Sequence, residues 1–135
     1  MLVLDYQEYA RWIAAAKRSL DSAKSDPDNS WACFKAEQSA QLAFKALLHL
    51  LGKAAWGHGL LRLAKETGIS GYDLECVQFL SRLYIPTRYP DALPEGEPSE
   101  YFSQEDKRKA IQSSPDIVSW VEKVEQSLAG QEKSA

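Results

Sequence analysis

The sequence predicts an all-α fold, an up-and-down bundle of about five helices. Apolar residues recur at spacings of three and four over several long segments, which places them along one face of an α-helix. No segment shows the apolar–polar alternation between turn residues that is typical of a half-buried strand. Hydrophobic residues make up 44% and charged residues 26% of the 135, an ordinary globular composition, so residues 1–135 are expected to form a single domain.

The first predicted helix covers residues 3–24, and the turn after it is rich in helix-breaking residues. Its apolar stripe consists of residues three or four apart, namely Tyr6, Tyr9, Ile13, Ala16, Leu20 and Ala23. The turn at residues 25–29 contains Pro27, which cannot continue helical hydrogen bonding. Asn29 or Ser30 is expected to cap the next helix, because a short polar side chain there accepts an unpaired backbone N–H.

The second predicted helix, residues 30–51, has apolar residues on two faces. One face carries small residues near its start and larger ones near its end: Cys33, Ala36, Ala40, Ala43, Phe44, Leu47 and Leu51. The opposite side mixes apolar and polar residues: Trp31, Phe34, Lys35, Gln38, Gln41, Leu42, Lys45 and His49. This pattern favours a subunit interface, and a central helix in a monomer gives the same pattern. Gly52 is expected to end the helix in a left-handed conformation.

Two short helices and a long loop are expected next. The third helix covers residues 59–67 and is stopped by Gly68, and the fourth covers residues 72–84. Four prolines then enforce an extended loop: Pro86, Pro90, Pro94 and Pro98. A loop of this length is uncommon in a compact domain and is more often functional than a simple connection.

The last predicted helix begins at Ser103, which forms a capping-box pattern with Asp106. Pro115 interrupts the helical pattern, either as a kink or as a fresh helix start with Ser114 as its cap. The apolar stripe continues beyond it to Leu128, and the polar tail at residues 130–135 is expected to fray.

Charge and composition narrow the classes of function. The net charge is −3 and the pI about 5.4, which disfavours a protein that coats nucleic acid through phosphate contacts. The N-terminus lacks a signal-peptide pattern and no apolar run is long enough to span a bilayer, so a cytoplasmic location is expected. Cys33 and Cys76 have no metal-ligand spacing and are expected to be buried thiols, so neither a metal nor a cofactor is predicted.

His58, between Gly57 and Gly59, is the candidate catalytic residue. Flanking glycines allow a phosphate or another backbone to approach closely, and an imidazole can transfer protons near neutral pH. The alternative is a structural histidine that caps a helix or binds a neighbouring carbonyl.

The start of the proline-rich loop is the second candidate site. Two guanidinium groups and two phenols lie within ten residues and could grip a phosphate and stack on a base: Arg82, Tyr84, Arg88 and Tyr89, with Thr87 and Asp91 beside them. In the alternative, Arg88 pairs with Asp91 or another acid, and the tyrosines pack the loop against the bundle.

The third candidate is a polar stripe on the second helix, formed by Lys35, Gln38, Gln41 and Lys45. Their spacing lines them up on one face, so they could border a cleft that receives Arg88 or His58. The alternative is a solvated helix surface. Lys45 therefore joins His58, Arg82, Tyr84, Arg88 and Tyr89 as a predicted nucleotide- or phosphate-binding residue.

Two separated segments resemble the HEPN family. WACFKAEQSAQLAFKALLHLLG followed by WGHGLLRLAKE is similar to its second and third helices, and LYIPTRYPDALPEGEPSEYFSQEDKRKAI is similar to the loop and last helix of stand-alone prokaryotic members. The resemblance implies a helical bundle that is usually a homodimer. It also implies a possible nucleotide ligand, a minimal nucleotidyltransferase encoded beside the protein as partner, and a role as half of a toxin–antitoxin pair.

Many HEPN proteins are metal-independent ribonucleases that use an Arg-x4–6-His motif, and this motif is absent here. No arginine precedes His49 or His58 at that spacing; Lys53 stands nearest, and lysine lacks the bidentate phosphate fork of arginine. The sequence therefore favours a HEPN-type binding module without catalytic activity. The alternative is a toxin-like ribonuclease whose variant site uses His58 with Lys53 or Arg88, and RNA is not excluded as a ligand.

Overall fold

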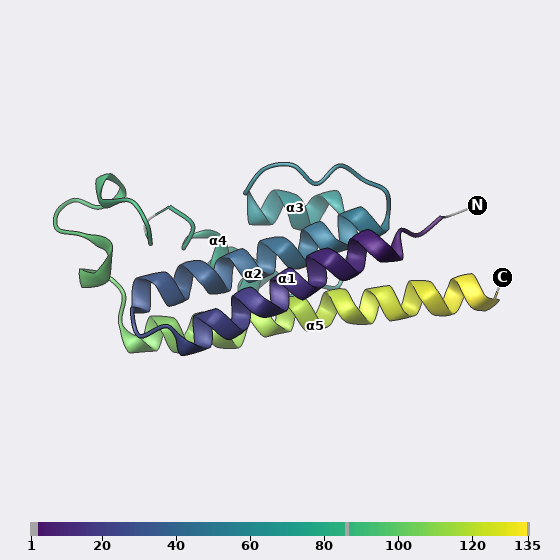
Figure 1. Ribbon diagram of the computed structural model, residues 1–135. Helices are drawn as coiled ribbons and strands as arrows, with labels where there is room; N and C mark the ends of the chain where they lie inside the picture. Colours follow the sequence, from purple (N-terminus) through teal and green to yellow (C-terminus); the bar gives the residue numbers. More distant parts are fainter. Residues whose placement is uncertain (1–2, 86, 135) are drawn as a thin grey trace.

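The fold is an all-α bundle, as the sequence predicts. The computed structural model describes residues 3–85 and 87–134, and in these ranges it contains no strand. Three long helices lie side by side (Figure 1): α1 (Tyr6–Ser25), α2 (Asn29–Leu50) and α5 (Gln104–Ser134). The short helices α3 (Leu60–Glu66) and α4 (Leu74–Ser81) pack against α2. Both chain ends lie at one end of the bundle, and the loop between α4 and α5 projects from the other end (Figure 1).

Short polar side chains begin the long helices. Asp28 caps α2 by accepting the N–H groups of Ser30 and Trp31, at 2.9 and 3.2 Å. The cap is therefore one residue before Asn29 and two before Ser30, the predicted caps, because Asp28 is the last residue with an extended backbone. The capping box before α5 is confirmed: the Ser103 N–H donates to the Asp106 carboxylate at 2.9 Å, and the Asp106 N–H donates to the Ser103 hydroxyl.

Helix α2 occupies the centre of the bundle. Its fully buried alanines, at positions 32, 36, 40, 43 and 46, let neighbouring helices approach closely. The buried Ser39 hydroxyl donates to the Ala16 carbonyl of α1 at 2.7 Å, while Phe44 meets the Trp120 ring of α5 with ring centroids 6.0 Å apart. The predicted core face of this helix thus has partners within the chain itself, whereas Trp31 on the opposite side is 46% exposed, so the predicted subunit interface stays a prediction.

A glycine in the left-handed region ends α2. Gly52 has φ 69°, and the following Lys53 N–H donates to the Leu48 carbonyl at 2.9 Å. This is the helix end that the sequence predicts, since only glycine adopts this conformation without steric cost.

Helix α5 passes through Pro115 and continues to Ser134. The helix does not restart at Ser114, and its backbone is helical beyond Gly130. Fraying of the predicted tail at residues 130–135 stays a prediction, and residue 135 lies outside the described residues. Packing supports the helix as far as Leu128, because Val124 and Leu128 are half-buried against the core.

The loop between α4 and α5 is partly ordered into turns. It contains two 3-10 turns, η1 (Pro90–Ala92) and η2 (Pro98–Glu100), where the sequence predicts an extended chain. Pro86, one of the four prolines behind that prediction, lies outside the described residues. The buried Thr87 hydroxyl anchors the start of the loop by donating to the Leu83 carbonyl. At the far end, the Asn29 amide of α2 donates to the Phe102 carbonyl at 3.3 Å.

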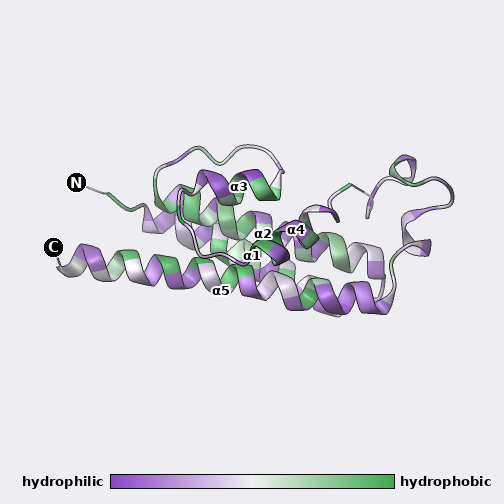
Figure 2. Cartoon of the chain, turned by 180° about the vertical axis from the view of Figure 1, so that it is seen from behind, coloured by the Kyte–Doolittle hydropathy of each residue, from purple (hydrophilic) through white to green (hydrophobic). Residues whose placement is uncertain are grey.

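Hydrophilic and hydrophobic positions alternate along α5 (Figure 2), as expected for a helix with one face on the core. Among the described residues, no helix is both long and apolar enough to cross a membrane.

The hydroxyl of Ser114 on α5 is buried and has no hydrogen-bond partner within the described part of the chain. We expect Ser114→Ala to raise the free energy of unfolding by about 1 kcal/mol, because it removes an unsatisfied polar group. The matched variant Ser39→Ala should lower it by about 1 kcal/mol, because the Ser39 hydroxyl is bonded to a carbonyl. Urea unfolding measures both, and a loss of stability in Ser114→Ala would contradict the expectation.

Candidate functional site

A buried carboxyl lies in the middle of α2. Glu37 is 0% exposed, and it is the single acidic residue in the sequence of this helix. Its two oxygens accept hydrogen bonds from the Gln41 amide nitrogen, at 2.9 and 2.6 Å, and the Gln38 amide donates to it at 3.3 Å. Burial raises the pKa of Glu37 to about 7, although these amides and the positive charges of Arg88 and Lys45 pull the pKa down.

Gln41 connects this buried carboxyl to His58 at the surface. The Gln41 side-chain oxygen lies 3.1 Å from Nδ1 of His58, while its nitrogen faces Glu37. His58 is exposed and belongs to the loop before α3, directly after Gly57, whose φ of 85° requires glycine. Of the structural roles considered for His58, the hydrogen bond to a carbonyl is present, and the carbonyl belongs to a side chain of α2.

Tyr84 brings the loop after α4 to His58. The two rings stack, with centroids 5.2 Å apart and an angle of 14° between the planes. Tyr84 also contacts Phe34 of α2, with ring centroids 6.2 Å apart. The polar stripe of α2 and the proline-rich loop, predicted as separate candidates, therefore meet at one place.

Arg88 lies among three aromatic rings. Its guanidinium carbon is 4.4 Å from the ring centre of Tyr84, 4.5 Å from that of Phe34 and 4.7 Å from that of Tyr89. The guanidinium Nε donates to the Tyr84 carbonyl at 3.4 Å, whereas neither terminal nitrogen has a hydrogen bond or ion pair within the described ranges. We call Phe34, His58, Tyr84, Arg88 and Tyr89 the aromatic cluster.

Lys45 lies one helical turn beyond Gln41 on α2. It is half-buried, with Nζ 6.0 Å from the Trp12 ring centre, and Trp12 in turn stacks on His49 at 4.6 Å. Burial lowers the pKa of Lys45, and the charge of Glu37 opposes this shift. Lys45 thus supplies a cation beside the cluster rather than inside it.

The sequence and structure comparisons agree on a family. The family model of the HEPN domain matches residues 9–124. The chain belongs to the HEPN family. TT1696 from Thermus thermophilus has a similar structure, with a TM-score of 0.80 and 32% identity over 85% of this chain and 96% of that chain. ST0689, an archaeal HEPN homologue, has a TM-score of 0.70 and 33% identity over 84% of this chain and 94% of that chain. No curated protein matches the sequence.

The predicted binding residues of this HEPN chain separate into three groups. His58, Tyr84, Arg88 and Tyr89 lie together in the aromatic cluster, whereas Lys45 lies over Trp12, one helical turn beyond Gln41. Arg82 lies elsewhere: its Nη1 donates to the Gln78 carbonyl at 3.3 Å, and its guanidinium lies over Phe79 at 6.0 Å. Arg82 is the C-cap of α4, two residues before Tyr84, so the helical rotation turns it away from the cluster.

Two further sequence expectations change in the structure. Lys53 is the nearest match to the missing arginine of the HEPN ribonuclease motif. Its ammonium donates to the carbonyls of Glu66 and Thr67 at the end of α3. Lys35, grouped with Gln38 and Gln41 in the predicted stripe, instead pairs with Asp26 at 2.7 Å.

Glu37 is the functional candidate that the sequence prediction misses. Its neighbours Ala36 and Ala40 belong to the predicted core face, and nothing in the apolar spacing indicates a buried acid. The feature of the sequence that could have indicated this residue is its chemistry and not its spacing. Glu37 is the lone acid in a helix of 22 residues and stands one turn before Gln41.

The two cysteines are free thiols. Burial raises the pKa of the Cys33 thiol to about 12 and that of the half-buried Cys76 thiol to about 11. Asp73, Cys76 and Asp116 place possible ligand atoms within 4.8 Å of one another. The Asp73 carboxylate already caps α4 through the Cys76 N–H, and a metal would need the thiolate that the raised pKa disfavours.

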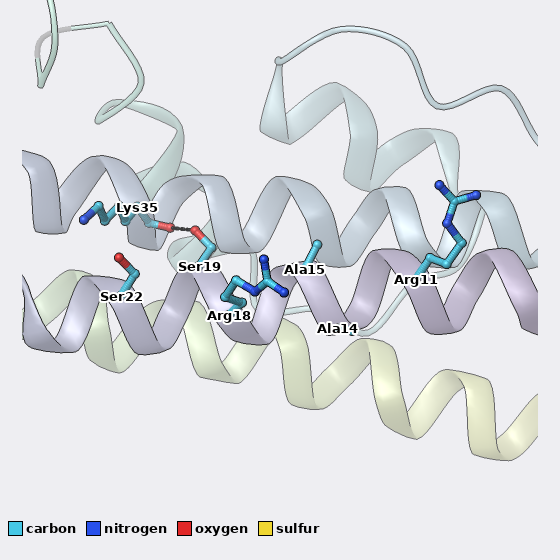
Figure 3. Close-up of a pocket in the computed structure, with 7 residues that line it drawn as sticks. All are labelled: Arg11, Ala14, Ala15, Arg18, Ser19, Ser22 and Lys35. Atoms are coloured by element: carbon cyan, nitrogen blue, oxygen red, sulfur yellow. Dashed lines mark hydrogen bonds between the residues drawn. The ribbon is translucent and has the colours of Figure 1, made fainter.

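A separate groove lies between α1 and α2 (Figure 3). Its volume is about 400 Å³, and it is lined by Arg11, Ala14, Ala15, Arg18, Ser19, Ser22 and Lys35. Two of its three cations are already neutralised, since Arg11 pairs with Glu8 and Lys35 with Asp26, each at 2.7 Å. The groove contains none of the aromatic-cluster residues, so it is a different surface from the candidate site.

The buried carboxyl makes stability depend on pH. An acid whose pKa is raised by folding stabilises the native state below its unfolded pKa, near 4.5, and this contribution is lost as the pH rises through about 7. Between pH 5 and pH 8 we expect wild type to lose roughly 2–3 kcal/mol more unfolding free energy than Glu37→Gln. Urea unfolding at several pH values measures the difference.

The control for this prediction is Glu75→Gln, which changes an exposed acid on α4. Its pH profile should coincide with that of wild type. A Glu37→Gln profile that also follows wild type would show that Glu37 does not titrate as described.

Proposed function

We propose that this HEPN chain is a homodimeric binding module that holds a nucleotide at the aromatic cluster. The observation that carries the proposal is Arg88, whose guanidinium is stacked among three rings while both terminal nitrogens lack partners within the described residues. A cation held in this way, with no acid neutralising it directly, is suited to an anionic ligand.

The orientation of Arg88 suits a phosphate. The guanidinium carbon lies over three rings, while the terminal N–H groups have no partner within the described residues. These two N–H groups can donate to two phosphate oxygens at once. His58 lies on the same Tyr84 ring and supplies a second polar contact at the surface. Lys45 adds positive charge one turn along α2.

Exposed rings beside Arg88 suit a nucleobase. Tyr89 is 45% exposed, and Trp31, whose ring centroid lies 5.7 Å from that of Phe34, is 46% exposed. Protein side chains commonly hold single bases by stacking on open aromatic faces of this kind.

The same residue types favour a homodimer. Tryptophan, tyrosine and arginine dominate the binding energy of protein interfaces, and Trp31, Arg88 and Tyr89 present all three on one surface. A second copy placed here would cover the exposed rings and enclose the ligand. A minimal nucleotidyltransferase, the partner that the family resemblance implies, would compete for this surface or bind the assembled dimer.

A variant ribonuclease site is the second candidate function. His58 and Arg88 both lie against Tyr84, so a proton-transferring imidazole and a phosphate-binding cation share one site. A ribonuclease site that pairs His58 with Lys53 is not proposed, because the Lys53 ammonium donates a hydrogen bond to the Thr67 carbonyl at the end of α3.

Binding of ATP tests the nucleotide proposal. Titration followed by tryptophan fluorescence and by melting temperature should show binding by wild type. Arg88→Ala should weaken binding about tenfold or more, because it removes charge-assisted hydrogen bonds to phosphate worth about 1.5–3 kcal/mol. The matched control is Arg82→Ala, which removes an exposed arginine from outside the cluster and should bind like wild type.

Two outcomes would contradict this prediction. No binding at millimolar ATP rejects the nucleotide ligand for the isolated chain, and equal weakening in both arginine variants rejects the site. RNA incubated with wild type and His58→Ala decides the second candidate, since cleavage lost only in the variant would favour the ribonuclease.

The oligomeric state in solution tests the homodimer. Sedimentation should show a dimer for wild type and a shift towards monomer for Trp31→Ala, because truncation removes an exposed ring from the proposed interface. Trp56→Ala is the control, since Trp56 is 78% exposed and lies in the loop before His58 without a ring contact in the described part of the protein. A monomeric wild type would contradict the homodimer.

A further inference from the structure

The hydrogen bonds around Gln41 determine where the proton of His58 lies. The Gln41 nitrogen donates to both oxygens of Glu37, so the amide presents its oxygen to Nδ1 of His58. An amide oxygen only accepts hydrogen bonds, and therefore Nδ1 must carry the proton. A neutral imidazole has a single N–H, which leaves Nε2 of His58 as a bare acceptor.

Nε2 is also the nitrogen that a ligand would meet. Within the described residues only Nδ1 of His58 has a hydrogen-bond partner, and the side chain is exposed at the surface, where it stacks on Tyr84. The hydrogen-bonding character of this one atom therefore depends on groups buried in the helix behind it.

We propose that Glu37 is a positioning residue that acts through the Gln41 amide to decide whether Nε2 of His58 accepts or donates a hydrogen bond to a ligand. The proposal rests on the proposed function, because it concerns the same site. It is not a statement about the fold, which a hydrophobic residue at position 37 would serve as well.

The two states differ by one proton on Glu37. When the Glu37 carboxylate is ionised, the Gln41 nitrogen donates to it and the Gln41 oxygen faces Nδ1 of His58, so Nε2 of His58 is an acceptor. With the carboxyl protonated, its O–H needs an acceptor, and a half-turn of the Gln41 amide supplies the oxygen. The amide nitrogen then donates to Nδ1, which gives up its proton to water while Nε2 takes one, so the imidazole stays neutral.

Both states are accessible near neutral pH. Burial raises the pKa of Glu37 to about 7. The polar groups that face its carboxyl are the amides of Gln38 and Gln41 and the cations Arg88 and Lys45, and all four favour ionisation. A phosphate oxygen accepts hydrogen bonds and so selects the protonated state, whereas a sugar hydroxyl or base N–H can donate to the ionised state.

Nitrogen-15 NMR of the imidazole rings tests this proposal without any ligand. At about pH 8, above the Glu37 pKa, wild type should show His58 protonated at Nδ1 and bare at Nε2. Glu37→Gln removes the fixed acceptor, so the Nδ1–H form should give way to the Nε2–H form or a mixture. Gln41→Met, which deletes the amide at similar volume, should also abolish the Nδ1–H preference.

His49 is the internal control, because the chain has only two histidines and His49 stacks on Trp12 away from the Glu37–Gln41 pair. Its signals should stay unchanged in both variants, and unchanged melting curves would confirm that the variants fold. An Nε2–H form in wild type, or an Nδ1–H form that survives in both variants, overturns the proposal.

The ligand-free readout separates this proposal from the proposed function. If His58 changes form in the variants but ATP does not bind wild type, the positioning role stands and the nucleotide fails. If ATP binds and His58 keeps its form, the nucleotide stands and the positioning role fails. Where both hold, inorganic phosphate should bind several-fold more tightly to Glu37→Gln than to wild type at about pH 8.

Discussion

The burial of α2 on almost every side is the constraint on which the rest of the structure depends. Small side chains such as Ala36 and Ala40 let the long helices close around it, and Phe44 fills the wider end against α5. The fully enclosed polar side chains of α2, such as Glu37, Ser39 and Gln41, cannot reach water. Each of them must therefore find a partner inside the protein, and these partners connect the core to the surface.

Glu37 shows how this constraint produces a site. Burying a carboxyl costs stability, and the two amides that bond to it recover only part of the loss, since its pKa still rises to about 7. An apolar side chain would fill the position without that cost. The acid fixes the Gln41 amide, the amide holds His58, and His58 stacks on Tyr84. A costly group that orders a chain of surface residues is better explained by function than by stability.

The sequence predicts the helices well because their cause is local. Apolar spacing alone places α1, α2, α3 and α5 within a few residues of their observed bounds, and Gly52 and Ser103 mark helix ends by their own chemistry. The site is harder because its contacts are not local. Apolar spacing indicates neither that the acid at position 37 is buried nor which amide meets it. Likewise, Arg82 and Arg88 are equivalent in the sequence and differ only once α4 and its loop have folded.

The position of Arg88 bears on the missing HEPN ribonuclease motif. That motif supplies its arginine from the residues just before the histidine, and here Lys53 takes the place and binds the end of α3. Here an arginine contacts the same tyrosine as His58, but it comes from a loop thirty residues later and lies among three rings. Contacts with three rings restrict the rotation of this guanidinium, so its terminal N–H groups keep one orientation towards a ligand. The arrangement keeps a cation and a histidine on one tyrosine ring, but the cation comes from a different part of the chain and is held by aromatic contacts. A cation fixed in this way is better suited to binding an anion than to moving with it during a reaction.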